Sequence, residues 1–535
     1  CWTVAEMLKG KSLIDKERQS ELVEALDQVD MSTGAGPKLK QILIRGVGVH
    51  HAGVMPRYRR VVEDLFQRKL LAMCVCTETL AAGINLPARS VVLPNLLKGP
   101  KDKRVLVDTA SAQQIFGRAG RPQFDDRGFV YALAHEDDVK INRWREKYDS
   151  IPEDTKDPGL LKAKKKLKKK MPKRRSGESY WTEQQFLQLQ QADAAELSSR
   201  GQLPWRLLAY MLGKDPAVQP LRDLVGKRLL PPKKIDEAQR ELNRMLITMW
   251  QAGYIGLDPL PSPSQKPAAS PSNKIRSGDP SDTEPASPAP TAGLFGELLD
   301  QMRGEEDTDA QESESEVTED TQIKVKQYDL ETYRPQQAAA KSELDRLVHL
   351  RSINPLYGVY LADLLAEADD DERIASFESV LEVPGTVARF TRMPRLEDMP
   401  PGTLATTRLD PQLLQMGLAT AEELGARQQD DEQDVEDRGY GRVMFDEPRV
   451  WPLTIGEKIY RLFQNDFPNV QGVRIRPVWI VGELLNYDGD FNKYVTSKRL
   501  HKQEGLVFRH LLRLILLVGE FTRLCPPDLP AEQWQ

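Results

Sequence analysis

The sequence has few cysteines and no long apolar run, and these two absences exclude several classes of protein. Only four of its 535 residues are cysteine, and no two of them form a CxxC pair, so a disulfide scaffold and a zinc knuckle are disfavoured. The longest apolar run, near 511–518, is interrupted by Arg513 and is far shorter than the roughly 20 residues that span a bilayer. We therefore expect a cytoplasmic protein of a reducing compartment, without a membrane segment or a metal site.

A large excess of charge of one sign is also lacking, since 75 basic and 80 acidic residues give a formal net charge of −5. The distribution is nevertheless uneven. Segment 305–320 carries nine acidic residues and no basic one, whereas ten of the fourteen residues at 162–175 are Lys or Arg. Such a stretch, with Lys165 and Lys169 as candidates, could contact nucleic-acid phosphates and release counterions. The alternative is a solvated charge run without a dedicated partner.

Length and shifts in composition predict several domains. Residues 1–135 alternate helical and strand patterns, which is typical of an α/β domain with a largely parallel sheet flanked by helices. Three helical segments at 200–257 end in an aromatic, Gly-punctuated turn and suggest a winged-helix-like domain. Pro-, Ser- and acid-rich composition predicts a disordered linker at 258–325. The expected parts are 1–140, 141–257, the linker 258–325, and a mainly helical region 326–535 with an acidic insertion at 427–438.

Short apolar runs indicate the strands of the first part. The run at 70–76 is apolar on both faces, as in a strand buried on both sides. Pro56 should open a helix, because it is followed by apolar residues at helical spacing. The further expected strands are 90–93, 104–107 and 129–134.

Two arginines lie in the sequence QIFGRAGR at 114–121. Arg118 and Arg121 are three residues apart, a spacing that predicts one side of a helical turn. The small residues around them, Gly117 among them, allow close backbone approach to a ligand. Guanidinium groups suit phosphate oxygens because their fork geometry is fixed. A solvated arginine pair on a surface helix is the alternative.

The sequence TETLAAGINLP at 77–87 directly follows the predicted strand at 70–76. Its first residues should therefore lie at the carboxyl end of a strand, where open α/β sheets bind ligands. Gly83 permits an unusual backbone conformation, and Asn85 and the threonine hydroxyls can bind phosphate or ribose. With GVGVHHAG at 46–53 upstream, three motifs follow one another within 76 residues.

The order HHAG, TETLAAGINLP and QxxGRAGR resembles the second RecA-like domain of superfamily-two DExH helicases, specifically the superkiller-type RNA helicases. The resemblance is specific over residues 1–135. It implies that Arg118 and Arg121 act as arginine fingers that reach the nucleotide's phosphates across an interdomain cleft. It also implies that Gln114 positions the attacking water or the γ-phosphate.

The resemblance further implies roles for the other two motifs. Gly83, Asn85 and Gly117 would line the ATP side of the cleft, and Thr77 and Thr79 would couple it to the nucleic-acid backbone. The remaining implied nucleic-acid contacts are His50, His51 and Gly53. A histidine pair in a turn with only a structural role is the alternative.

The family's phosphate-binding loop, GxxxxGK[ST], and its DExH box are not found in this sequence. The only GKS, at 10–12, has Ala5 in place of the first glycine and is expected inside a helix. Because CWTVAEML at the start resembles a helix already in progress, we expect a chain truncated at its start. ATP and Mg²⁺ would then be bound mainly by a first RecA-like domain outside the chain, and the chain alone would hydrolyse ATP negligibly.

Two functions remain open from the sequence. The first is the C-terminal part of an ATP-dependent, 3′-to-5′ helicase that acts on RNA, or on DNA, within an RNA-degradation or processing complex. The second is a non-catalytic RNA-binding or scaffold protein that retains one motor domain. Outside the motifs, 503–524 predicts an amphipathic helix, and Trp205 and Trp250 fall on apolar helical faces expected to lie in the core.

Overall fold

The computed structural model describes most of the chain. It leaves out most of the predicted linker and the acidic insertion, so those two predictions lie outside the described residues. The described residues are 1–8, 10–77, 88–99, 103–121, 125–152, 157–193, 197–262, 328, 330–425, 451–526 and 529–534.

The N-terminal part is a parallel strand pair covered by helices. Strands β1 (Val47–His50) and β2 (Met73–Cys76) pair in parallel, and helix α4 (Pro56–Gln67) connects them, as a parallel crossover requires. As predicted, Pro56 opens α4, whose buried residues recur at helical spacing. The remaining helices are α1 (Trp2–Met7), α2 (Lys16–Asp27) and α3 (Gly36–Leu43).

Two local predictions for this part are wrong. The β2 strand is only half-buried, and its last residue, Cys76, is exposed. Among the described strands it pairs only with β1. The GKS tripeptide does not lie in a helix, because α1 ends at Met7 and Gly10 has a φ of +86°.

A second parallel pair follows, formed by β3 (Ser90–Leu93) and β6 (Phe129–Ala132). An isolated bridge between Ala88 and Ala119 extends the contact in the same parallel sense. Helix α6 (Thr109–Phe116) packs with α9 (Glu183–Gln191) over a small apolar cluster beside these strands. The parallel pairing confirms the α/β prediction for this part of the chain. A short antiparallel pair lies beside it, β4 (Leu97–Lys98) with β5 (Val105–Leu106).

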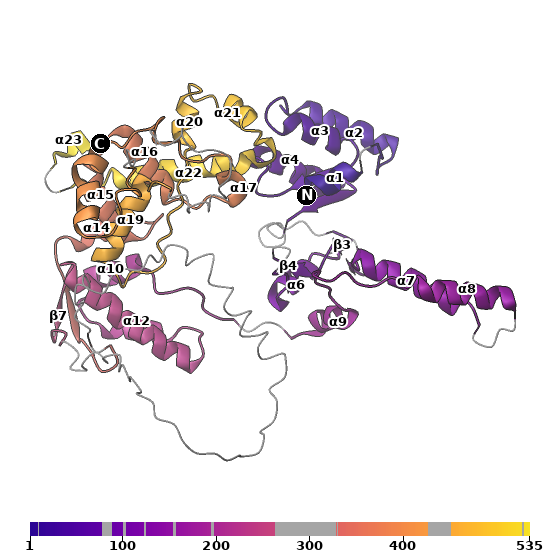
Figure 1. The fold of residues 1–535 in the computed structure, drawn as a ribbon, viewed down its shortest axis with the longest axis horizontal. Coiled ribbons are helices and arrows are strands. Elements are labelled where there is room, and N and C mark those ends of the chain that lie inside the picture. The colour runs from indigo at the N-terminus through magenta and orange to yellow at the C-terminus, as the bar shows by residue number, and fades with distance from the viewer. Residues whose placement is uncertain are drawn as a thin grey trace, which may run out of the picture.

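Helices α7 (Glu136–Asp149) and α8 (Pro158–Lys169) project from this part as an arm (Figure 1). The Trp144 indole N–H donates to the carbonyl of Leu167, 2.8 Å away, and so ties the two helices together. Lys164 donates to the carbonyl of Ile151 and lies 5.1 Å from the ring of Tyr148. The basic stretch is therefore mainly helical rather than irregular.

The helices predicted at 200–257 are present as α10 (Trp205–Lys214), α11 (Gln219–Gly226) and α12 (Pro232–Gln251). Strand β7 (Ile255–Asp258) follows them and pairs antiparallel with β8 (Gln337–Ala340). Because β8 comes from beyond the predicted linker, the two sides of that linker share one sheet. Trp205 and Trp250 are both packed, partly buried, against the core.

The largest hydrophobic core joins these helices to the C-terminal helices. The predicted helix at 503–524 is confirmed as α22 (Glu504–Phe521). None of the helices in the described part of the chain is both long and apolar enough to cross a membrane. The other elements are α14 (Leu344–His349), α15 (Pro355–Leu365), α16 (Asp370–Ser379), α17 (Gly385–Ala388), η1 (Ala405–Leu409), α18 (Asp410–Gln415), α19 (Ile455–Asp466), α20 (Val481–Leu485), α21 (Phe491–Ser497), η2 (His501–Gln503) and α23 (Ala531–Trp534).

A buried contact between a histidine and a carboxylate holds α22 to α16. His510 Nε2 lies 2.9 Å from Glu378 Oε1, and both side chains are at least 97% buried. The Glu378 carboxylate also accepts hydrogen bonds from the backbone N–H groups of Ile480 and Val481. Three donors thus satisfy one buried carboxylate, as a buried charge requires. His510 therefore has a structural role, in the packing of α22 against α16.

Candidate nucleotide and nucleic-acid site

The predicted arginine pair follows the end of α6. The carboxylate of Asp108 caps the helix start by accepting from the N–H of Ser111, 2.9 Å away, and Gly117 is the C-cap. Arg118 and Arg121 therefore do not share a helical turn, which corrects the prediction from their spacing. The turn breaks because Ala119 joins the bridge to Ala88. The next residue, Gly120, then takes a φ of +91°, a conformation that favours glycine.

Arg121 makes a bidentate ion pair with Asp125. Its Nε lies 2.7 Å from Oδ2 and its Nη2 lies 2.7 Å from Oδ1, and its backbone N–H donates to the same carboxylate. These bonds lower the pKa of Asp125 to about 2, so the carboxylate is ionised at neutral pH. The sequence prediction did not include Asp125, although an acidic residue four positions after a candidate arginine indicates a possible ion-pair partner.

Gln114 lies on the last turn of α6 and is exposed. Its neighbour Gln113 instead points to another element, since its Nε2 donates to the carbonyl of Ala192 at the end of α9, 2.6 Å away. Arg118 is half-buried, and its carbonyl accepts from the N–H of Ala88. The structure thus places the three predicted catalytic residues around one end of α6.

Thr77 directly follows β2, as predicted, and is exposed. Its N–H donates to the carbonyl of His50, the last residue of β1, at 3.4 Å. The two parallel strands therefore end together and present the HHAG turn beside the start of TETLAAGINLP. Thr79, Gly83 and Asn85 lie outside the described residues, so their roles stay predictions.

The geometry does not support a nucleic-acid contact for His50. Its side chain is only 2% exposed, and its Nε2 lies 2.7 Å from Glu63 Oε1 on α4. His51 accepts from the N–H of Gly53 through Nδ1 and packs edge-on against Trp2. Burial lowers the pKa of His51 to about 4, so it is neutral at physiological pH and cannot attract phosphate by charge.

Gly53 also has a structural role. Its carbonyl accepts from the N–H of Gly505 at 3.0 Å, and a Cβ at Gly53 would lie 2.6 Å from the carbonyl oxygen of Lys502. The HHAG turn is thus covered by the start of α22 rather than open to a strand. We did not predict this contact, because the two glycines are far apart in the sequence.

Lys165 and Lys169 are exposed on α8. The arginines at the end of the basic stretch are paired, Arg174 with Asp138 at 2.6 Å and Arg175 with Asp137 at 2.8 Å. The acidic start of α7 thus neutralises the arginines and leaves the lysines of α8 as the exposed cationic face.

The described residues contain no group of three or more His, Cys, Asp or Glu side chains arranged to hold a metal ion. These residues therefore do not form a Mg²⁺ site of their own.

Comparison with known proteins assigns a family to the region that carries the motifs. Residues 16–123 match the helicase conserved C-terminal domain. The chain is similar to the DExH-box ATP-dependent RNA helicase DExH15, chloroplastic, of Arabidopsis thaliana, with 35% identity over 132 residues that cover 24% of the chain and 11% of that protein. It is also 36% identical to the ATP-dependent RNA helicase mtr4 of Schizosaccharomyces pombe over 115 residues, 21% of the chain and 10% of that protein.

A third relative is named for DNA. The ATP-dependent DNA helicase Hel308 of Pyrobaculum calidifontis is 38% identical over 132 residues, which cover 24% of the chain and 18% of that protein. The matched part of the chain therefore spans less than a fifth of each of these relatives. The comparisons support a helicase C-terminal domain with a RecA-like fold, in line with the α/β expectation for this region.

Proposed function

We propose that this chain is the C-terminal part of a superkiller-type, ATP-dependent nucleic-acid helicase that acts on RNA. The observation that carries the proposal is the turn after α6, where Arg121 is held by Asp125 and Gly120 bends the backbone. Gly120 and Arg121 lie within residues 16–123, which match a helicase C-terminal domain, and Asp125 lies two positions beyond that range. A winged-helix DNA-binding regulator would be a further interpretation of the helices at 200–257, but it would leave that turn without a purpose.

In this proposal the nucleotide binds between this domain and a first RecA-like domain that supplies the phosphate-binding loop and the Mg²⁺ ligands. Mg²⁺, when bound there, would neutralise phosphate charge. Arg118 and Arg121 would stabilise the charge that develops on the transferred phosphoryl group, an effect worth about 10³–10⁵ in rate where arginine fingers act. Exposed Gln114 would orient the attacking water.

Asp125 gives this mechanism a conformational step. Arg121 cannot offer both of its forked N–H groups to a phosphate while Asp125 holds them at 2.7 Å. Before the nucleotide binds, Asp125 acts as a positioning residue that holds Arg121 beside the cleft. Nucleotide binding then draws the guanidinium away from Asp125. The exchange replaces one anionic partner with another, so the guanidinium is never left without a counter-charge.

Strand binding in this proposal uses two surfaces. Exposed Thr77 at the end of β2 contacts the strand backbone near the cleft, together with the neighbouring predicted residues of its motif. The exposed lysines of α8, including Lys165 and Lys169, contact phosphates at a distance from the cleft. His50, His51 and Gly53 support this arrangement by fixing the turn beside Thr77 rather than by touching the strand.

ATP turnover tests the proposal. The 535-residue chain alone should hydrolyse ATP negligibly, whereas the same chain joined after its own first RecA-like domain should show ATPase activity stimulated by single-stranded RNA. Robust turnover by the chain alone would contradict our assignment of the phosphate-binding loop to another domain. A joined protein that binds RNA but never hydrolyses ATP would favour the alternative of a non-catalytic scaffold.

A partner complex for RNA degradation or processing is part of the same proposal. Its support is the similarity to relatives that are named as RNA helicases. Affinity purification of the tagged protein from its own cells would test it, with co-purification of nucleases as the expected result. Recovery of DNA-repair proteins instead would favour DNA as the substrate.

A further inference from the structure

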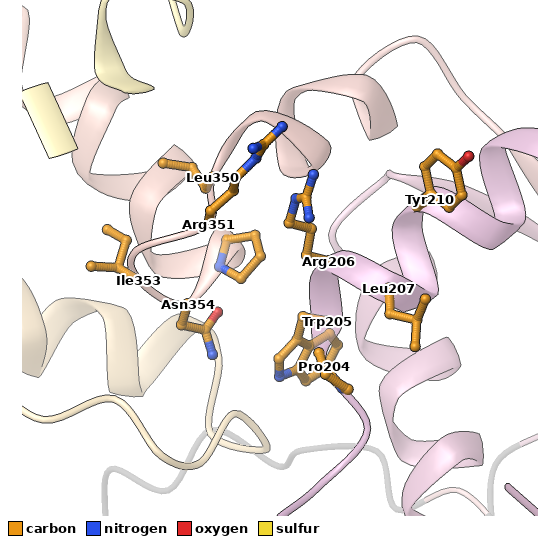
Figure 2. Close-up of a pocket in the computed structure, with 10 residues that line it drawn as sticks. Pro204, Trp205, Arg206, Leu207, Tyr210, Leu350, Arg351, Ile353 and Asn354 are labelled. Carbon is orange, nitrogen blue, oxygen red and sulfur yellow. The ribbon is translucent and has the colours of Figure 1, made fainter. Parts of the chain in front are cut away.

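A cavity lies between the first turns of α10 and the loop that connects α14 to α15 (Figure 2). Its volume is about 580 Å³, which is within the range of small-ligand pockets. One wall comes from 204–210 and the other from 350–355, so the two walls belong to segments on opposite sides of the predicted linker. None of the 10 residues drawn as its lining is acidic.

Two arginines give the cavity a positive charge. Arg206 uses its Nε to donate to the carbonyl of Val348 at 2.7 Å, which leaves its terminal nitrogens available. The Arg351 guanidinium has no hydrogen-bond or ion-pair partner among the described residues. Figure 2 shows both guanidinium groups directed to the same side of the cavity. Two such groups suit a phosphate.

The carboxylate of Glu520 bonds to the loop that carries Arg351 and, among the described residues, forms no ion pair with either arginine. Glu520 accepts from the backbone N–H groups of Arg351 and Ser352 and from the Ser352 hydroxyl. Its two oxygens thus hold the loop of the cavity in place. Glu520 of α22 thereby holds the backbone of the loop that carries Arg351, and the Arg351 guanidinium remains in the lining of the cavity.

Aromatic side chains complete the lining. Trp205 is partly buried and packs against the core, while Tyr210 is 51% exposed on the next turn of α10, with the Lys214 ammonium 5.9 Å from its ring centroid. Exposed aromatic rings beside arginines are the combination on which single-stranded bases stack while their phosphates are held. The expectation that Trp205 is only a core residue therefore leaves out its position in the lining.

We propose that this cavity binds one nucleotide unit of a single nucleic-acid strand, with its phosphate on Arg206 and Arg351 and its base against the exposed ring of Tyr210. The inference rests on the proposed function for the presence of a strand. It adds a contact made by α10 and the α14–α15 loop, outside the region that matches the helicase domain. A planar, phosphorylated ligand fits both halves of the lining, whereas an acidic peptide would use only the arginines.

The test uses the whole 535-residue chain and a 12-nucleotide RNA that carries 4-thiouridine and a fluorescent label. Photocrosslinking followed by peptide mapping should place adducts in 204–210 or 350–355. Arg351→Glu and Tyr210→Ala should each weaken binding by about tenfold and remove those adducts. Arg474→Glu is the matched control, because Arg474 is exposed and lies outside the cavity, and it should change affinity by less than about twofold. Circular dichroism should show all variants folded.

Three results would overturn the inference. The first is RNA binding without adducts in either segment. The second is an equal loss for Arg351→Glu and Arg474→Glu, which would indicate a general charge effect. The third is competition by adenosine monophosphate at concentrations near those of the RNA, which would indicate a mononucleotide site. The ATPase experiment remains independent, so a failure here leaves the proposed function standing, and adducts in the cavity without ATP turnover would fail only the proposed function.

Discussion

The Glu504 carboxylate at the start of α22 accepts a hydrogen bond from the backbone N–H of Ala35, 3.1 Å away, across 469 positions of sequence. The adjacent Gly505 donates to the carbonyl of Gly53. The C-terminal helix is thus anchored beside β1, the strand that ends next to Thr77. This anchor connects the helical C-terminal region to the motif beginning at Thr77, which we propose contacts the nucleic-acid strand.

Glu504 makes this anchor sensitive to pH. Burial raises its pKa to about 7, although the nearby charge of Arg57 opposes the rise, and its Oε1 is buried without a hydrogen-bond partner among the described residues. Because the folded state holds this proton more tightly than the unfolded state, the contribution of Glu504 to stability falls as pH rises from about 4.5 to about 7 and stays constant above that.

Glu504→Gln should therefore stabilise the protein at pH 8 by on the order of 1 kcal/mol and change it little at pH 5, since the amide oxygen can still accept from Ala35. Urea unfolding of the variant and the wild type at both pH values measures this difference. Exposed Glu382→Gln serves as the control and should show no such pH-dependent gap. An equal gap at pH 5 and pH 8 would show that Glu504 is not the titrating group.

Gly505 is predicted to be needed for close approach of α22. A Cβ there would lie 2.5 Å from the carbonyl oxygen of Val54, so Gly505→Ala should destabilise the protein by about 2 kcal/mol. Gly519→Ala in the same helix meets nothing within 4 Å and should be neutral or stabilising by up to about 1 kcal/mol. Chemical denaturation measures both, and an equal effect of the two variants would contradict docking at Gly505.

The lysines of α8 should set part of the salt dependence of RNA binding. Removing two phosphate contacts with Lys165→Gln and Lys169→Gln should reduce the slope of log affinity against log salt by roughly 1.4, at about 0.7 per contact for single strands. Lys233→Gln with Lys234→Gln, an exposed pair at the start of α12, is the control. A slope that does not change with the α8 variant would identify the arm as a solvated charge run.

Asp125 should matter for catalysis through Arg121. In the chain joined to the first RecA-like domain that the proposed function requires, Asp125→Asn should lower kcat by about tenfold while KM for ATP changes little, because the guanidinium loses the partner that positions it. Asp126→Asn changes the same charge at an exposed neighbour and should have little effect. A rise in kcat for Asp125→Asn would mean that Asp125 only competes with the nucleotide.

The sequence predicted local structure well where the residues of a single segment determine whether it forms a helix or a strand. Pro56 and apolar spacing indicated the helix at 56–67, and an apolar face at helical spacing indicated the helix at 503–524. The strand at 90–93 was indicated by its short apolar run. The α/β class of the motif region followed from the alternation of such segments.

Contacts between distant segments could not be predicted in the same way. The burial of His50 depends on Glu63, which lies on a crossover helix, and the pairing of β7 with β8 joins the two sides of a long linker. The spacing of Arg118 and Arg121 predicted a shared helical turn, but α6 ends at Phe116 and Ala119 instead bridges to Ala88. The cavity beside Arg351 likewise exists only once 204–210 and 350–355 are brought together.

The central claim is that Arg121 acts on the nucleotide, and one substitution tests it most directly. In the chain joined to the first RecA-like domain that the proposed function requires, Arg121→Ala should reduce RNA-stimulated ATP turnover by about 10³-fold or more, with RNA affinity retained within about threefold. Arg127→Ala, at an exposed arginine nearby, should keep turnover close to wild type. Turnover that survives in Arg121→Ala would contradict the account.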